Sequence, residues 1–463
     1  MQSLLKNEID ISLMPNSQSC LMVSETQLQS IHQKLKALKG SGDLNCEGAD
    51  RRENLHRLFM YPAMMVPAAQ YAVIKAVAGY LPNGAWTVDP FMGSGTSLLS
   101  CMEFGFNVYG QDINPFAVML TKAKVEKYDI SFLKNTCKTV LENVAADKDD
   151  TIAVTFKNID KWFNPEVQID LSRIRRSIQK VDSKLIRYFL WVIMSEVIRI
   201  GSNDRTSTFK LHRRSEEDIQ KRNINIVEEF STLVNRGIED VEVYWTKLTK
   251  ESERTEEDFG VKAEICWGNT KHAIESDMRF DLLVSSPPYG DNHTTVTYGQ
   301  TSYLPLQWID AGDLDCPFDY LKTTQEIDRQ SLGGKLNKKE INGIIELLFA
   351  KTPSLKSFFE GIPEDERDRY YKTLSFIADF DESLNHIVAS MKDDAFYIWT
   401  IGNRYVGNRE VPNDQVLIEL MESRGITLFE RAERQILNKK QPKKNNYSKT
   451  MEKEHILIFH RSV

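Results

Sequence analysis

The chain has few cysteines, and they are scattered along its 463 residues. They are Cys20, Cys46, Cys101, Cys137, Cys266 and Cys316. No two of them have CxxC spacing, and no Cys/His cluster accompanies them, so the sequence predicts neither a zinc site nor a disulfide framework. We therefore expect reduced thiols, no bound metal and a cytoplasmic location.

Long apolar runs are also missing. The start of the chain has no basic segment followed by an apolar run, which argues against a signal peptide. The longest apolar stretches, such as Tyr188 to Ile193, are far too short to span a bilayer. We expect no association with a membrane.

Excess positive charge is a third absence. The formal net charge is −7 at pH 7, whereas a protein that grips phosphates over its whole surface should be basic. Any contact with nucleic acid must therefore come from a local patch. The composition is otherwise that of a globular protein, with 41% hydrophobic and 27% charged residues.

Short apolar runs alternate with helical patterns over part of the chain. A helix is predicted over 67–80, a strand over 86–89, a helix over 96–104 and a strand over 107–112. Further strands are predicted at 263–267, 280–285, 395–401, 427–430 and 455–460, with a helix over 414–424. This alternation predicts an α/β fold with a doubly wound, Rossmann-like sheet.

Two long polar segments interrupt that pattern, and both read as helical insertions. We expect a chain organised as an N-terminal arm (1–57), a first core part (58–124), a helical insertion for target recognition (125–260), a second core part (261–310), a second helical insertion (311–390) and C-terminal core strands with a basic loop (391–463).

A glycine-containing loop lies between the first predicted strand and its helix. It reads Asp89-Pro90-Phe91-Met92-Gly93-Ser94-Gly95-Thr96. Glycines at such a turn allow close approach of the backbone to a ligand. Asp112 follows Gly95 by seventeen residues, at the end of the next strand, where a carboxylate can accept hydrogen bonds from ribose hydroxyls. No Gly-Lys-Ser/Thr follows, which excludes a Walker loop.

A proline-rich turn, Ser286-Pro287-Pro288-Tyr289-Gly290, follows the strand at 280–285. Prolines remove N–H donors and stiffen the turn, so hydrogen-bond acceptors dominate it. The Ser286 hydroxyl and the Pro287 carbonyl can accept hydrogen bonds from a base amino group, and Tyr289 offers a face on which a flipped base can stack. No cysteine follows the prolines, which argues against C5-cytosine chemistry.

Together these segments resemble a known family. DPFMGSGT followed by YGQDINP resembles motifs I and II of the DNA amino-methyltransferases, and SPPY resembles their motif IV. Tyr61 to Pro67 is similar to motif X, Gly268-Asn269-Thr270 to motif III, Ala395 to Arg404 to the motif VI region and Arg434 to Lys439 to motif VIII. The similarity covers residues 58–125, 263–310 and 395–460 but neither insertion, and the motif order fits none of the usual groups.

The resemblance implies a Rossmann-like methyltransferase that binds S-adenosyl-L-methionine. Its expected catalytic residues are Ser286, Pro287, Pro288 and Tyr289. Its expected cofactor-binding residues are Asp89, Phe91, Gly93, Ser94, Gly95, Thr96, Asp112, Ile113, Asn269, Tyr61 and Pro62. Asp112 is expected at the ribose and Asn269 near the adenine.

The base is left open between two alternatives. Serine at the first position of this turn is commoner among N4-cytosine enzymes of the family, whereas Asp or Asn is commoner among N6-adenine enzymes. The resemblance therefore favours cytosine N4 over adenine N6, in a specific sequence of double-stranded DNA. It implies a role in restriction-modification or phage defence, with restriction or defence proteins as partners.

Two segments carry local positive charge. Residues 172–222 contain thirteen Lys/Arg against six Asp/Glu, and residues 431–453 contain eight against two. Such segments favour phosphate contacts, although a charged helix is more often a solvated face. The expected DNA-binding residues are Arg205, Thr208, Lys210, Arg213, His293, Lys439 and Lys440.

Two rival functions stay open from the residues alone. An RNA base amino-methyltransferase uses similar Pro-Pro-Tyr turns, but residues 1–50 show no RNA-binding module. A catalytically silent DNA-binding subunit would not need Asp89, Asp112 and the SPPY turn together. A fused nuclease would require a catalytic constellation that the insertions do not display.

Overall fold

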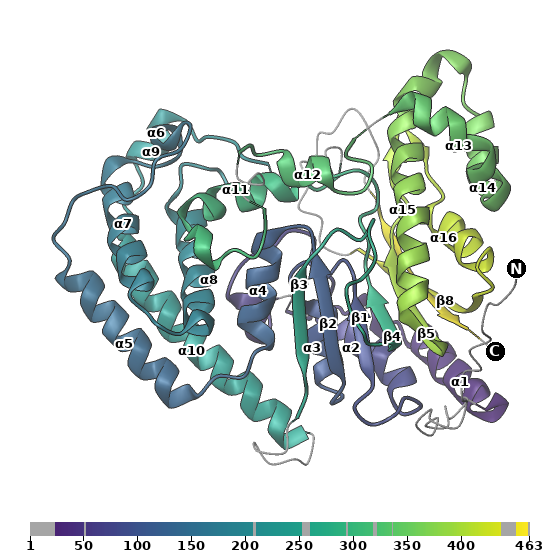
Figure 1. The fold of residues 1–463 in the computed structure, drawn as a ribbon, viewed down its shortest axis with the longest axis horizontal. Helices are drawn as coiled ribbons and strands as arrows, with labels where there is room; N and C mark the ends of the chain where they lie inside the picture. The colour runs from purple at the N-terminus through teal and green to yellow at the C-terminus, as the bar shows by residue number, and fades with distance from the viewer. Residues whose placement is uncertain are drawn as a thin grey trace, which may run out of the picture.

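The computed structural model describes residues 24–50, 52–206, 210–251, 260–292, 295–317, 322–335, 337–436 and 451–461. A seven-stranded sheet forms its centre, with helices on both faces (Figure 1). In spatial order the strands are β3 (Ala263–Trp267), β2 (Asn107–Asp112), β1 (Trp86–Asp89), β4 (Phe280–Ser285), β5 (Met391–Ile401), β9 (Lys453–His460) and β8 (Thr427–Gln435). The predicted Rossmann-like α/β fold is confirmed.

The direction of the strands places five carboxyl ends at one edge. β3, β2, β1, β4 and β5 are parallel, whereas β9 runs antiparallel between β5 and β8. Ligands of open α/β sheets bind outside the carboxyl ends of the strands. Asp89, Asp112 and Ser285 end three adjacent strands at this edge.

All predicted strands are present, and three are longer than expected: β5, β8 and β9, the last of which begins at Lys453 rather than His455. β5 begins at Met391 rather than Ala395, because Met391 pairs with Phe280 across a register shift in β4. The intervening Lys392-Asp393-Asp394 is polar and broke the apolar pattern, but Lys392 forms an ion pair of 2.7 Å with Asp281. β8 continues to Gln435 as the cross-strand partner of β9.

Side chains alternate between two apolar cores, one on each face of the sheet. On β5, Phe396 and Ile398 belong to one core, and Tyr397 and Trp399 belong to the other. This alternation is the period of two that a β-strand imposes. Both faces are buried, as expected where helices cover a parallel sheet.

The first face is covered by core helices and by the first insertion. Its helices are α1 (Glu25–Ser41), α2 (Pro67–Ala78), α3 (Thr96–Met102), α4 (Pro115–Val125), α5 (Ile130–Ala146), α7 (Pro165–Gln179), α8 (Lys184–Gly201), α10 (Ile226–Glu251) and α11 (Tyr298–Trp308). The run that includes Tyr188 to Ile193 is the fully buried middle of α8. The 125–260 segment thus shares one continuous core with α2, α3 and α4.

The second face is covered by the second insertion and the C-terminal helix. Its helices are α13 (Lys338–Lys351), α14 (Pro353–Glu360), α15 (Tyr371–Ser390) and α16 (Asn413–Glu422). Figure 1 shows these helices on one side of the sheet, opposite the lobe of α5, α7, α8 and α10.

The short elements lie between the larger ones. They are η2 (Asp43–Asn45), η3 (Asn54–Arg57), α6 (Ile159–Trp162), α9 (Glu216–Gln220), η4 (Ala311–Asp313), α12 (Glu326–Gln330), η6 (Glu364–Tyr370) and the hairpin of β6 (Tyr405–Val406) and β7 (Arg409–Glu410). Across the described ranges, no helix is long and apolar enough to cross a bilayer. The same residues contain no cluster of three His, Cys, Asp or Glu that could hold a metal ion.

Candidate active site

The glycine loop between β1 and α3 depends on two left-handed backbone positions. Gly93 has φ +48° and Gly95 has φ +74°, a region that side chains disfavour. A Cβ on Gly95 would lie 2.8 Å from Cγ2 of Thr121 on α4. The absence of a side chain therefore lets the loop pack directly on α4.

Asp112 holds this loop from the end of β2. Its Oδ2 accepts a hydrogen bond of 2.9 Å from the Gly93 amide, and its Oδ1 accepts one of 2.8 Å from the Asn114 amide. Desolvation raises the pKa of Asp112 to about 6. Each carboxylate oxygen keeps a further lone pair for a ligand hydroxyl.

Asp89 is placed differently from the expectation of direct ligand contact. Its side chain is fully buried, and it accepts hydrogen bonds from Ser285 Oγ at 2.6 Å, from the Phe91 amide at 3.0 Å and from Ser97 Oγ. Burial raises its pKa to about 6. In this structure Asp89 joins β1, β4 and α3 beneath the cavity and does not line it.

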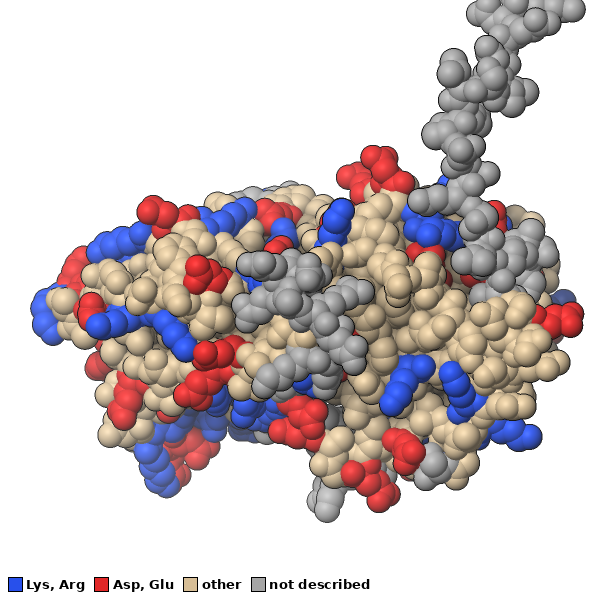
Figure 2. All heavy atoms as spheres, turned by 90° about the horizontal axis from the view of Figure 1, so that it is seen from below, with Lys and Arg blue, Asp and Glu red and all other residues tan. Residues whose placement is uncertain are grey.

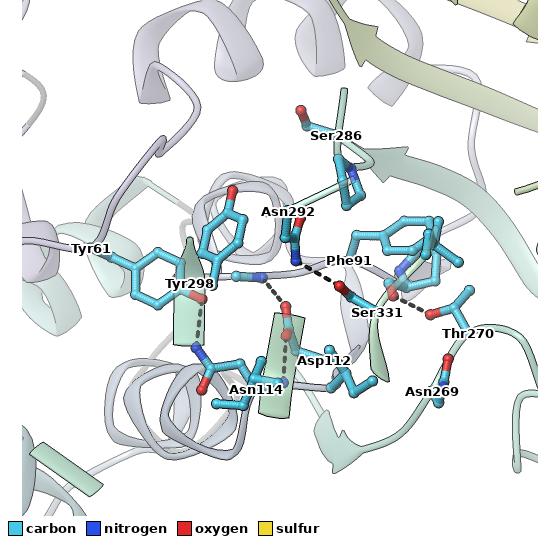
Figure 3. Close-up of a pocket in the computed structure, with 16 residues that line it drawn as sticks. Tyr61, Phe91, Asp112, Asn114, Asn269, Thr270, Ser286, Asn292, Tyr298 and Ser331 are labelled. Carbon is cyan, nitrogen blue, oxygen red and sulfur yellow. Dashed lines mark hydrogen bonds between the residues drawn. The ribbon is translucent and has the colours of Figure 1, made fainter. Parts of the chain in front are cut away.

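A cavity that is partly open to solvent lies at the carboxyl edge of the sheet, and its space free of atoms, open solvent included, is about 610 Å³. Its lining residues are Tyr61, Pro90, Phe91, Gly93, Asp112, Ile113, Asn114, Asn269, Thr270, Ser286, Pro288, Asn292, Tyr298, Ile327, Ser331 and Leu332. Figure 3 shows Asp112 and Asn114 at one end and Ser286 at the other.

The cavity brings together many of the residues expected from the motifs. Those that line it are Tyr61, Phe91, Gly93, Asp112, Ile113, Asn269, Ser286 and Pro288. Pro62, Ser94, Thr96 and Pro287 are buried around it without lining it, like Asp89 and Gly95. Residues separated by more than 200 positions in the chain thus enclose one space.

One wall comes from the second insertion, which carried no motif. Ile327 on α12 and the following Ser331 and Leu332 line the cavity. Asn292, after the proline turn, donates a hydrogen bond of 2.9 Å to Ser331 Oγ (Figure 3). Its Oδ1 atom is buried without a hydrogen-bond partner among the described residues. No sequence pattern pointed to this wall.

A second wall joins motif X to the loop after β2. The rings of Tyr61 and Tyr298 stack with centroids 5.7 Å apart. Asn114 donates hydrogen bonds to Tyr61 Oη at 3.1 Å and Ser302 Oγ at 2.7 Å. The sequence held a signal for Asn114. It stands two residues after Asp112 and directly before Pro115, and an Asn in that position is a typical helix N-cap.

The proline turn is tied to the last two strands of the sheet. Tyr289 Oη lies 3.2 Å from Ser286 Oγ and donates a hydrogen bond of 3.1 Å to Glu454 Oε1 on β9. Arg434 on β8 pairs with the other oxygen of Glu454 at 2.6 Å. Burial, followed by the nearby Glu454 carboxylate, raises the pKa of Tyr289 well above its usual value.

The end of the turn requires glycine. Gly290 has φ +154°, and a Cβ there would collide with the Arg404 guanidinium. Arg404 Nη1 pairs with the buried Asp291 carboxylate at 3.2 Å. The Arg404 side chain therefore packs directly against the turn and holds it from the motif VI side.

The first basic segment is largely neutralised within the fold. At least eight of its thirteen cations form ion pairs, five of them with acids outside the segment; the eight are Arg173, Arg175, Arg176, Lys184, Arg187, Arg199, Arg213 and Lys221. Counting charge along residues 172–222 therefore overstated the local field, because folding brings in acids such as Asp313. Arg205 and Lys210 are exposed.

The segment around Arg205 lies next to the region that follows the proline turn. The Leu211 amide donates a hydrogen bond of 3.1 Å to Gln300 on α11. Thr208, His293, Lys439 and Lys440 lie outside the described residues. The face seen in Figure 2 carries cations and anions interspersed, with no field of one sign among the residues it colours.

Relatives at the sequence level are DNA-modification enzymes. The chain is 33% identical over 431 residues to type II methyltransferase M.MvaI of Kocuria varians, covering 88% of this chain and 91% of that protein. It is 30% identical over 149 residues to type II methyltransferase M.MjaII of Methanocaldococcus jannaschii, covering 30% and 28%. No protein-family model matches the chain.

Among solved structures, the chain is similar to the rRNA methyltransferase aviRa of Streptomyces viridochromogenes. The identity is 10%, 86% of each chain is covered, and the TM-score is 0.28, which is too low to bear on substrate. The sequence similarity to M.MvaI is much stronger evidence, because it spans nearly the whole of both chains. The chain therefore belongs to the type II methyltransferases and is a site-specific DNA methyltransferase that uses S-adenosylmethionine.

Proposed function

We propose that this enzyme methylates the N4 amino group of cytosine in a specific double-stranded DNA sequence. The observation that carries the proposal is Ser286, which stands first in the proline turn and lines the cavity opposite Asp112. Serine at this position is typical of the N4-cytosine branch of the family that the motifs resemble.

The cavity fits S-adenosylmethionine in its chemistry. Asp112 and Asn269 line the same cavity, and in this proposal Asp112 accepts hydrogen bonds from the ribose hydroxyls while Asn269 contacts the adenine. Asn292 lines the cavity, and its Oδ1 atom is buried without a hydrogen-bond partner among the described residues. A hydroxyl or amino group of a ligand could donate a hydrogen bond to this oxygen. Phe91 and Ile113 add apolar walls.

When bound, S-adenosylmethionine supplies a methyl group on a positively charged sulfur, and the base amine displaces that sulfur directly. The N–C bond would form as the C–S bond breaks, leaving S-adenosylhomocysteine, and the proton lost by the amine would pass to solvent. The residues of the turn position the amine: the Ser286 hydroxyl and the Pro287 carbonyl accept hydrogen bonds from its two N–H groups, which directs its lone pair at the methyl carbon.

DNA contact is proposed at the mouth of the cavity. Exposed Arg205 and Lys210 lie on a segment that is tied to α11, which follows the turn. Arg213, Thr208, His293, Lys439 and Lys440 complete the proposed set. Such side chains would hold phosphates and leave the sequence to be read by neighbouring groups. In this proposal the enzyme acts in restriction-modification or defence, together with a partner protein.

The experiment is expression in a host without DNA methylation, followed by digestion of the DNA to nucleosides and mass spectrometry. We expect N4-methylcytosine, which sequencing would map to one recognition site. Ser286→Ala should lower its yield strongly while leaving measurable activity. DNA that contains only N6-methyladenine would overturn the cytosine assignment while leaving a site-specific DNA methyltransferase in place.

A further inference from the structure

Tyr289 connects the proline turn to the last strand of the sheet by two hydrogen-bond contacts. Its hydroxyl lies 3.2 Å from Ser286 Oγ and 3.1 Å from Glu454 Oε1. Glu454 is 165 residues away in the chain and only partly exposed. Through Tyr289, Glu454 is linked to Ser286, which lines the cavity, and an ionised carboxylate can only accept hydrogen bonds.

The Glu454 carboxylate forms an ion pair with Arg434. The Arg434 guanidinium is 6% exposed and lies 2.6 Å from Glu454 Oε2. The two residues are direct cross-strand partners on β8 and β9. A charge-assisted hydrogen bond of this kind is stronger than a neutral one, and guanidinium keeps its proton in proteins.

The direction of each hydrogen bond then follows from counting protons. The Tyr289 hydroxyl has one proton, which it donates in its hydrogen bond to the Glu454 carboxylate. Burial raises the pKa of Tyr289 well above its usual value, so the phenol stays protonated at neutral pH. For the contact between the two hydroxyls, Ser286 must therefore be the donor and Tyr289 the acceptor.

In this arrangement Ser286 Oγ presents only its lone pairs to the substrate. Its single proton points back to Tyr289, away from any group that approaches from the cavity. An amino group of a base can then donate to Ser286 Oγ, whereas a reversed hydroxyl would present a proton to the amine and oppose its approach.

We propose that Glu454 is a positioning residue that orients the Ser286 hydroxyl through Tyr289, so that its oxygen faces the base amine as an acceptor. The inference rests on the proposed function only in that Ser286 contacts the amine. It holds equally for cytosine N4 and adenine N6.

The first test is Glu454→Gln, with steady-state methylation measured on a DNA fragment that contains the mapped site. The glutamine amide can donate to Tyr289, which allows the whole chain of hydroxyls to reverse. We expect kcat to fall roughly 10- to 100-fold, as for the loss of a charge-assisted hydrogen bond, while the KM values for S-adenosylmethionine and DNA stay within about twofold. Glu452→Gln is the matched control, because Glu452 is an exposed glutamate on the same segment.

The second test is a double-mutant cycle with Tyr289→Phe, which keeps the ring and removes the connecting hydroxyl. If Glu454 acts through Tyr289, adding Glu454→Gln to Tyr289→Phe should change kcat by less than about twofold. A merely structural role of Glu454 predicts instead that the two losses multiply and that the melting temperature falls with them. Ser286→Ala should likewise make the effect of Tyr289→Phe on kcat disappear.

Two results would overturn the inference: a wild-type kcat in Glu454→Gln, or multiplying losses in the cycle with Tyr289→Phe. If Glu454→Gln fails to fold, the cycle of Tyr289→Phe with Ser286→Ala decides, and independent losses there also overturn it. The proposed function fails separately, on the identity of the methylated nucleoside, which none of these kinetic ratios depends on.

Discussion

The Lys124 ammonium donates a hydrogen bond of 2.9 Å to the Ser94 carbonyl, inside the protein and behind the glycine loop. Lys124 is fully buried, and its other close neighbour is His56 Nδ1 at 3.5 Å. Burial lowers the pKa of Lys124 to about 7. Burial, together with the charge of Lys124, lowers the pKa of His56 well below its usual value. The loop is thus fastened to α4 at the cost of burying a cation.

Lys124→Met should stabilise the protein below pH 7 and lose that advantage as the pH rises. Below pH 7 the Lys124 ammonium is charged in both the folded and the unfolded protein, so folding of the wild type carries the full desolvation cost of roughly 3–5 kcal/mol. The Lys124→Met variant avoids this cost but leaves the Ser94 carbonyl without its hydrogen bond, which costs about 1–3 kcal/mol. Between pH 7 and about 10.4 only unfolded lysine is charged, so the wild-type protein gains stability relative to the variant.

Urea unfolding of both proteins from pH 6 to pH 10 checks this sign. Lys122→Met is the control, because Lys122 on the same helix is partly exposed and pairs with Asp315. A Lys124→Met protein that is less stable than the wild type at pH 6 would show that the hydrogen bond outweighs the burial cost. We also expect weaker cofactor binding by this variant, since the loop loses its fastening.

Binding of S-adenosylmethionine should weaken as the pH falls below about 6. Desolvation raises the pKa of Asp112 to about 6, and protonation removes an acceptor for the ribose hydroxyls. A single titrating carboxyl changes Kd by at most about tenfold for each pH unit. Asp112→Asn should bind roughly 10- to 100-fold more weakly at pH 8 and should lose most of the pH dependence.

Calorimetric titration between pH 5 and pH 8 measures both effects. Asp89 also has a raised pKa of about 6, and burial raises the pKa of Asp328, beside the cavity wall, to about 7, so any dependence left in Asp112→Asn reports on these two carboxyls. Unchanged affinity of Asp112→Asn at pH 8 contradicts the ribose role.

Asn292→Ala should reduce cofactor affinity without changing the fold. The Asn292 Oδ1 atom lacks a hydrogen-bond partner among the described residues, and a bound ligand that donates to it would supply the missing hydrogen bond. We expect Kd to rise about 5- to 30-fold, corresponding to about 1–2 kcal/mol. Asn342→Ala, on the exposed face of α13, is the control. Equal affinities of the Asn292→Ala and wild-type proteins for the cofactor would mean that the cofactor forms no hydrogen bond with this oxygen.

Gly95→Ala and Gly40→Ala should have opposite effects on stability. At Gly95 the backbone is left-handed, and a Cβ would approach Thr121 Cγ2 to 2.8 Å, so the cost should be about 2–4 kcal/mol. At Gly40, within α1, a Cβ meets nothing within 4 Å, and alanine should add about 0.5–1 kcal/mol to the free energy of unfolding. Thermal denaturation of the two variants measures both values, and a Gly95→Ala protein as stable as the wild type would exclude the close packing of the loop on α4.

Arg205→Ala should weaken DNA binding and lower its dependence on salt. Loss of one phosphate contact reduces the slope of log K against log salt concentration by about 1. Arg187 serves as the comparison, because it pairs with Asp313 at 2.7 Å. Arg187→Ala should lower stability instead, with an unchanged salt slope. Fluorescence anisotropy at several salt concentrations separates the two, and an unchanged slope for Arg205→Ala removes it from the phosphate contacts.

The sequence by itself determined the strands of the sheet and the two turns that enclose the cavity. Apolar runs of four to six residues, such as Trp86–Asp89 and Phe280–Ser285, mark buried strands because both faces of the sheet are covered. Glycine at position 95 and proline at positions 287 and 288 act through the local backbone, so the turns they form can be predicted without knowledge of the rest of the fold.

Only the tertiary structure decided which side chains surround those turns. Ile327 and Ser331 form a wall, Glu454 reaches Tyr289, and Asp313 neutralises Arg187. Each is a contact between segments more than a hundred residues apart or without a motif. Asp89 shows the same limit: its carboxylate carries the expected chemistry, but hydrogen bonds from Ser285 and Ser97 turn it inward. Charge and chemistry can be read along a chain, whereas their partners are set by how the sheet and its helices pack.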